Sequence, residues 1–186
     1  MKSMIIYTLL ALGFITLGII WFSTDPRPVH ERLRHYSGFG GQKTFLIQIS
    51  HSLLQVIGHI YLPVYAGVFN NLVVAIGLIG FVAGLTLAVW AKFTMKRVWG
   101  VPAQHDIKRQ NKLITNGPFR FTRNPIYVGL IMMSVGFAFS LRSMLFFTVY
   151  AVYWYFNNAV KREELLLEKH FGKEYETYKK QTPRFL

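Results

Sequence analysis

Apolar blocks separated by polar, mostly basic stretches make up this chain. The first block, residues 4–22, carries no charge and is close to the roughly 20 residues that an α-helix needs to cross a bilayer. Four further apolar blocks cover residues 44–69, 72–91, 126–141 and 144–160. The pattern predicts an all-α, integral membrane bundle of about five transmembrane helices with a cytoplasmic C-terminal amphipathic helix, in a single domain over residues 1–186. The block at 126–141 spans only about 24 Å as a helix, so it must recruit flanking residues or cross incompletely.

The N-terminal block could also be a signal peptide, because Lys2 precedes it. Its apolar run is longer than the usual core of a signal peptide. The sequence from Trp21 to Asp25 is also a poor match to the small-residue cleavage site of a signal peptide. We therefore expect an uncleaved helix.

Basic residues outnumber acidic ones by 21 to 8, which gives a formal net charge of +13. Five spans divide the 21 Lys and Arg residues so that 19 fall on one side of the membrane and 2 on the other. By the positive-inside rule, the N-terminus lies outside, while the C-terminus and the loops at 23–43 and 92–125 are cytoplasmic. Topology thus explains the charge, and no nucleic-acid partner is expected. The chain has no cysteine, which excludes disulfides, thiolate metal sites and a cysteine nucleophile.

The second block carries a polar stripe, since Gln48, His51, Gln55 and His59 are spaced to share one helix face. Three interpretations stay open: a haem or metal site on the two histidines, a hydrogen-bonded stripe between helices, or the wall of a substrate cavity. Two helical turns separate the histidines, too far to clamp one ion without other partners. In the third block, the small residues Gly77, Gly80 and Gly84 favour close packing within the chain over dimerisation.

Two cytoplasmic stretches, 112–129 and 161–178, carry the densest polar chemistry. Pro125 suits a first helical turn, with Asn124 at the cap position. A helix N-terminus beside Arg120 and Arg123 could dock a carboxylate or phosphate, or the helix could simply be capped there. The hairpin of the last two spans brings residues 163–164, both glutamates, back to this helix start. A zwitterionic, amino-acid-like ligand would suit such a site.

The same stretches carry a recognisable set of motifs. They are Leu113-Ile114, Gly117-Pro118-Phe119-Arg120, Arg123-Asn-Pro-x-Tyr127-x-Gly129, Glu163-Glu164-x-x-Leu167, Phe171-Gly172-x-x-Tyr175-x-x-Tyr178 and Pro183-Arg184-Phe185. This set resembles the isoprenylcysteine carboxyl methyltransferase-like family, whose core is shared by the related phospholipid methyltransferases. The resemblance is strong over residues 112–186 and weaker over 53–91.

The resemblance implies a membrane enzyme that uses S-adenosylmethionine in a cytosol-facing pocket built from about residues 111–186. From the positions that match the family motif, the resemblance implies that one wall of the cofactor pocket comprises Arg123, Asn124, Pro125, Tyr127 and Gly129. Glu163 or Glu164 would hold the cofactor's amino group, and Leu113, Ile114 and Leu167 would form an apolar lining. Phe171, Tyr175 and Tyr178 would pack the tail that closes the pocket. The chain has Asn111 and Asn124 where the family often has histidine.

The expected reaction is methyl transfer to a lipophilic or membrane-resident acceptor, such as a membrane lipid, through a carboxylate, amine or thiol. The candidates for a general base are His51, His59 and Glu164. Two alternatives remain: an NADPH-dependent membrane reductase that shares the C-terminal motif, and a non-enzymatic protein that binds haem through His51 and His59.

Overall fold

The computed structural model describes residues 2–25, 27–37, 39–95 and 112–186, and within these the side chains of residues 2, 3, 34–37 and 39–42 are left aside. The described chain is helical, and it contains no strand beyond an isolated bridge between Pro63 and Ser143. Its elements are α1 (Lys2–Ser23), α2 (Val29–Ser37), α3 (Phe39–Tyr61), η1 (Gly67–Phe69), α4 (Asn70–Met95), η4 (Gly117–Arg120), α5 (Pro125–Leu141), η5 (Met144–Thr148), α6 (Val149–Phe171) and α7 (Lys173–Gln181).

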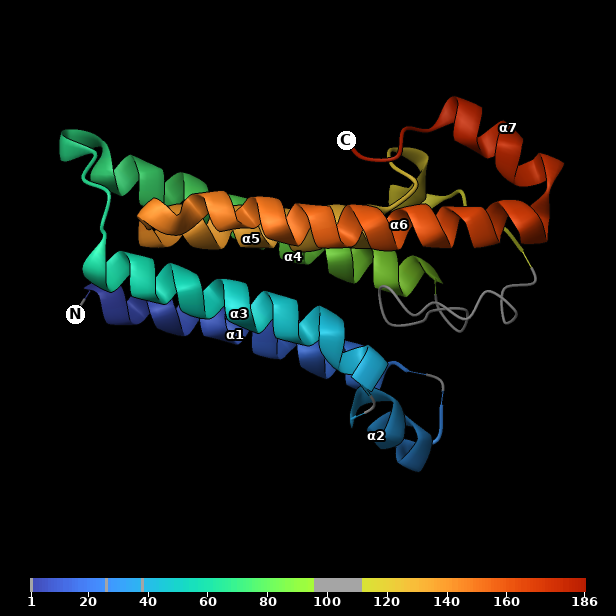
Figure 1. Ribbon diagram of the computed structural model, residues 1–186, viewed down its shortest axis with the longest axis horizontal. Coiled ribbons are helices and arrows are strands. Elements are labelled where there is room, and N and C mark those ends of the chain that lie inside the picture. The colour runs from blue at the N-terminus through green and yellow to red at the C-terminus, as the bar shows by residue number, and fades with distance from the viewer. Residues whose placement is uncertain (1, 26, 38, 96–111) are drawn as a thin grey trace.

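The long helices run along one axis of the molecule (Figure 1). The N-terminus and the connection between α3 and α4 lie at one end, whereas α2 and α7 lie at the other. Each apolar block of the sequence corresponds to a helix, with shifted bounds. The second apolar block, predicted over residues 44–69, extends past the end of its helix: α3 ends at Tyr61, and the following residues form a turn and η1. The fifth block begins with η5, and α6 continues past the apolar residues to Phe171.

Helix α5 lies at the centre of the bundle and contacts α1, α3, α4 and α6. Thirteen of its 17 residues are buried, although it is only about 26 Å long. Its most extensive contact is with α4. Gly77 and Gly84 of α4 face the backbone of α5, where a Cβ atom would collide with Ser140 and Gly129. The glycine stripe therefore allows close packing between helices of one chain, as expected.

The polar stripe of α3 faces α5 and η5. Gln48 accepts a hydrogen bond from Ser134 Oγ at 2.9 Å. His51 contacts Thr148 Oγ1 and the Ser134 carbonyl through its two ring nitrogens, at 3.1 and 3.2 Å. Gln55 donates to the Leu145 carbonyl, and His59 contacts the carbonyl of Leu141. These contacts favour the hydrogen-bonded stripe between helices among the three interpretations. No group of three or more potential metal ligands occurs among the described residues.

Large apolar side chains cover much of the outer surface, especially on α1, α3 and α4. Two segments, Met4–Ser23 and Gly67–Met95, are long and apolar enough to cross a membrane. The shorter apolar helix Pro125–Leu141 is the buried α5. The bundle thus buries the polar side chains of Gln48, His51 and Gln55 beside a hydrophobic core, while many other large apolar side chains lie on its outer surface.

Candidate functional site

A pocket lies where α5 begins, between α6, α7 and the segment that precedes η4. Eight of the ten residues that the sequence suggested for cofactor binding line it, namely Leu113, Ile114, Arg123, Asn124, Pro125, Tyr127, Glu163 and Leu167. Five further lining residues are Met95, Phe119, Ile126, Tyr175 and Tyr178. The fold therefore gathers at one point side chains that are up to about 80 residues apart in the sequence.

The start of α5 forms one wall of the pocket. Pro125 is the first helical residue, as predicted, and Asn124 occupies the N-cap position. The Asn124 side chain does not bond to the backbone of its own helix. Its Nδ2 instead donates to Glu164 Oε1 and to the Arg184 carbonyl, both at 3.1 Å. This asparagine therefore connects α5 to α6 and to the C-terminal segment.

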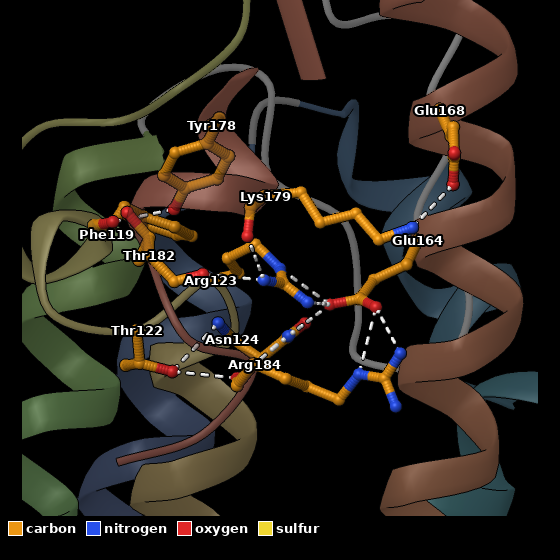
Figure 2. A network of polar contacts seen from close by, with 10 residues as sticks. All are labelled: Phe119, Thr122, Arg123, Asn124, Glu164, Glu168, Tyr178, Lys179, Thr182 and Arg184. Carbon is orange, nitrogen blue, oxygen red and sulfur yellow. Dashed lines mark hydrogen bonds and ion pairs between the residues drawn. The ribbon is translucent and has the colours of Figure 1, made fainter. Parts of the chain in front are cut away.

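Glu164 is the centre of a buried ionic network (Figure 2). Its Oε1 accepts hydrogen bonds from Arg123 Nε at 3.0 Å and from Asn124. Its Oε2 accepts two from Arg184, at 2.9 and 2.7 Å. Burial by itself would raise the pKa of the Glu164 carboxyl, but the hydrogen bonds from both arginines outweigh it and hold this pKa below its ordinary value. Glu164 is therefore a charged anchor.

Arg123 joins that network to the C-terminal segment. Its Nη1 donates to the carbonyls of Lys179 and Thr182, at 3.1 and 2.6 Å. Its backbone N–H donates to the Pro183 carbonyl at 2.9 Å. The neighbouring Thr122 Oγ1 donates to the Arg184 carbonyl at 2.9 Å. Together with Glu164, these bonds fasten α7 and the last residues of the chain over the start of α5 (Figure 2).

Glu163, the residue next to this anchor, lies at the pocket. Its carboxylate accepts a hydrogen bond from the Tyr127 hydroxyl at 2.7 Å. The two consecutive glutamates thus have different surroundings, because successive side chains on a helix point about 100° apart. One lines the pocket, while the other holds the C-terminal segment in place.

The opposite part of the pocket is apolar and is covered by α7. Leu113, Tyr175 and Tyr178 form a small buried cluster, against which Leu167 and Phe171 pack. The Tyr178 hydroxyl donates to the Phe119 carbonyl at 2.6 Å. Burial raises the pKa of both tyrosines far above the ordinary value, so their hydroxyls stay protonated.

Several suggested residues lie elsewhere. Gly129 is not among the lining residues and packs against Gly84 and Ala88 of α4. Glu164 is also absent from the lining, since its carboxylate serves the ionic network. His51 bonds to Ser134, which lies nine residues along α5 from Pro125, a rise of roughly 13 Å.

His59 lies farther still along the bundle, beside Leu141. The three candidates for a general base therefore do not meet at the pocket. Asn111 lies outside the described residues.

The anion-docking interpretation of the two arginines also changes. Arg123 is committed to Glu164 and to the C-terminal carbonyls, and Arg120 is exposed. Sequence reasoning gave no role to Arg184, although it lies in one of the recognised motifs. It also assigned Tyr175 and Tyr178 to packing alone. Only the folded tail reveals that both tyrosines line the pocket.

Fold and site together define an all-helical protein whose small-molecule pocket is closed by its own C-terminal segment. Residues 72–174 of this chain match the family model described as phospholipid methyltransferase, which is more than half of the chain. The chain belongs to this family. The match confirms the resemblance stated above and the prediction of a methyltransferase.

Similar curated proteins carry a related name. Protein-S-isoprenylcysteine O-methyltransferase of Mus musculus is 33% identical over 111 residues, which cover 59% of this chain and 39% of that protein. The Homo sapiens protein of the same name is 32% identical over 109 residues, covering 58% and 38%. A probable protein-S-isoprenylcysteine O-methyltransferase of Oryza sativa subsp. indica is 31% identical over 105 residues, covering 55% of each chain. The alignments thus span between about two fifths and just over half of these relatives. No solved structure matches significantly.

Proposed function

We propose that this protein transfers a methyl group from S-adenosylmethionine to a lipophilic or membrane-resident acceptor. The pocket at the start of α5 carries this proposal, because it combines a carboxylate, a helix N-terminus and an apolar wall around one space. S-adenosylmethionine has a matching set of groups: an ammonium, a carboxylate and a flat heteroaromatic base. When bound, it supplies a methyl group on a sulfonium that is already activated for displacement.

Glu163 is the residue we assign to the ammonium group of the cofactor. It lines the pocket, and the hydrogen bond from Tyr127 fixes the orientation of its carboxylate. The start of α5 faces the same space and favours a negatively charged group through the dipole of the helix. Leu113, Ile114 and Leu167 line the apolar part and suit the base.

The C-terminal segment keeps this pocket dry and ordered. Tyr175 and Tyr178 of α7 cover it, and the Glu164 network holds α7 in place. Alignment of the acceptor with the methyl group, away from water, is the main contribution that a protein makes to such a transfer. A carboxylate acceptor would need no general base, whereas an ammonium or thiol must first lose a proton. The name shared by the relatives makes an isoprenylated carboxylate the first acceptor to try.

The proposed setting is a membrane, which α1, α3, α4, α5 and α6 would cross. Exposed apolar side chains on α1, α3 and α4 support this arrangement, since water would oppose so much exposed apolar surface, and the buried polar stripe of α3 agrees with it. The 19-to-2 division of basic residues supports an outer N-terminus and a cytoplasmic C-terminus. The pocket, at the end of the bundle that holds α7, would then face the cytosol, where the cofactor is available.

Titration of the purified full chain with S-adenosylmethionine tests the proposal, followed by transfer of a tritiated methyl group into a membrane lipid extract and mass analysis of the product. We expect Glu163→Gln to weaken cofactor binding by about 10- to 100-fold, since it removes a charge-assisted hydrogen bond. Glu174→Gln, on the exposed side of α7, is the matched control and should bind like the wild type. Equal affinity in both variants would contradict the role of Glu163, and no binding by the wild type would contradict the proposal itself.

A further inference from the structure

Tyr175 has a buried hydroxyl that the fold itself does not use. Its side chain is 1% exposed, and its hydroxyl has no hydrogen-bond partner among the residues that the structure describes. The Arg123 guanidinium lies nearby, but the contact falls short of a normal hydrogen bond. Even a closer approach would leave the O–H hydrogen without an acceptor, because a guanidinium can only donate.

An unpaired buried hydroxyl is costly, so its position calls for an explanation. Tyr178, one turn along the same helix, meets the usual expectation, since its hydroxyl donates to the Phe119 carbonyl. Both tyrosines line the pocket. Among the described residues, the Tyr175 hydroxyl therefore has no acceptor, and it is a donor held at the pocket.

The surroundings of Tyr175 indicate which part of a ligand it would meet. Leu113 and Tyr178 are buried against it, and Leu167 and Phe171 pack on the same cluster. Glu163 and the start of α5 form the polar part of the pocket. The Tyr175 ring packs in the apolar cluster, and its hydroxyl lies near Arg123 and Glu164, where the apolar and polar parts meet. A flat heteroaromatic base suits the apolar part, and its ring nitrogens are hydrogen-bond acceptors. The high pKa of the Tyr175 hydroxyl, raised by burial, keeps its proton available for donation.

We propose that Tyr175 determines specificity for the adenine base of the cofactor, by donating a hydrogen bond from its hydroxyl to a ring nitrogen. The inference rests on the proposed function, since it takes S-adenosylmethionine as the ligand. The hydroxyl acts in recognition of the base and takes no part in the methyl transfer itself.

The test compares Tyr175→Phe with the wild type by calorimetric titration of the full chain. Two probes are used, S-adenosylmethionine and 5′-methylthioadenosine, which keeps the adenosine half but lacks the amino-acid half. We expect Tyr175→Phe to bind both probes about 3- to 10-fold more weakly, the value of one hydrogen bond. Glu163→Gln should weaken S-adenosylmethionine alone. Tyr150→Phe removes the hydroxyl of a residue in the first turn of α6 that is 70% exposed, and it should leave both affinities unchanged.

Thermal unfolding without ligand provides a second readout. Tyr175→Phe should match or exceed the wild-type melting temperature, because it removes an unpaired polar group. Tyr178→Phe should melt lower, because it breaks a buried hydrogen bond and leaves the Phe119 carbonyl unpaired. If Tyr175→Phe melted as low as Tyr178→Phe, the hydroxyl would have a partner within the protein and the inference would be wrong.

The outcomes separate this inference from the proposed function. A wild type that binds neither probe overturns the proposed function. If the wild type binds S-adenosylmethionine and Tyr175→Phe binds it with equal affinity, only the role of Tyr175 is overturned. Weaker binding of S-adenosylmethionine with unchanged binding of 5′-methylthioadenosine also overturns it, because the hydroxyl would then serve the amino-acid half.

Discussion

Glu164→Gln should release the C-terminal segment from the bundle. The side chains of Glu164 and Arg123 are only 5% and 8% exposed, so their ion pair at 3.0 Å is screened little by water. Glutamine removes the charge that both arginines face, and its amide hydrogens point at a guanidinium that can only donate. Breaking one partner of such a buried pair costs about 3–5 kcal/mol. Because the Arg184 side chain is 36% exposed and can turn to solvent, we expect the lower value, about 3 kcal/mol.

Limited proteolysis of the purified protein with trypsin measures this release. Lys179 and Lys180 lie in the last turn of α7 and become cleavable when the segment opens. When opening is fast compared with cleavage, the cleavage rate follows the population of the open form, so about 3 kcal/mol corresponds to roughly 100-fold faster cleavage. Mass analysis of the released peptide identifies the site.

Glu168→Gln provides the matched control. Glu168 lies one turn farther along α6 and pairs with Lys179 of α7 at 3.1 Å, but both side chains are more than a third exposed. Exposed pairs of this kind contribute about 0–1 kcal/mol, so cleavage should accelerate by less than about fivefold. If Glu164→Gln and Glu168→Gln were cleaved at similar rates, the reasoning that burial makes Glu164 the anchor would be refuted.

Two further predictions follow from the same contacts. The pKa of Glu164 is lower in the folded protein than the ordinary value of about 4.3. The stabilising effect of its charge is therefore complete above that value and disappears as the pH falls through the folded pKa. Hydrogen exchange should show α7 losing protection on acidification below about pH 4, and Glu164→Gln should lose this pH dependence. The chain has no cysteine, so single cysteines can be introduced at Val68, which is 91% exposed between α3 and α4, and at Lys180. In sealed vesicles, an impermeant thiol reagent should label the two sites from opposite sides, and labelling of both from one side would contradict the proposed topology.

Much of the helical architecture could be predicted from the sequence, because long uncharged blocks leave few alternatives to a helix. Pro125 marked the start of α5 correctly, since proline suits a first turn and cannot donate inside a helix. The bounds were less certain where no charge interrupts the apolar run. The apolar run continues past the end of α3 at Tyr61, where Pro63 is the one signal for a helix end. The 3₁₀ turn η5 cannot be told from an apolar helix by its sequence.

Most residues of the candidate site could also be predicted from the sequence, because the motifs show which residues the family keeps together. The roles within the site were not. Glu163 and Glu164 are identical in type and adjacent in sequence, and a rotation of about 100° between them sends one to the pocket and the other to two arginines. His51 attracted attention as a candidate base, and its partners on α5 account for its burial.

By itself, the sequence determined the helical class, the family and the stretches that build the pocket, because periodicity, charge and motif spacing are properties of the chain alone. The tertiary structure decided which side chains meet. It brought Arg184, near the end of the chain, onto Glu164 of α6, and it placed Tyr175 in the pocket with a hydroxyl that has no partner among the described residues. Such contacts depend on how the helices pack and on where the C-terminal segment folds back against the bundle. They join residues that have no fixed spacing in the sequence.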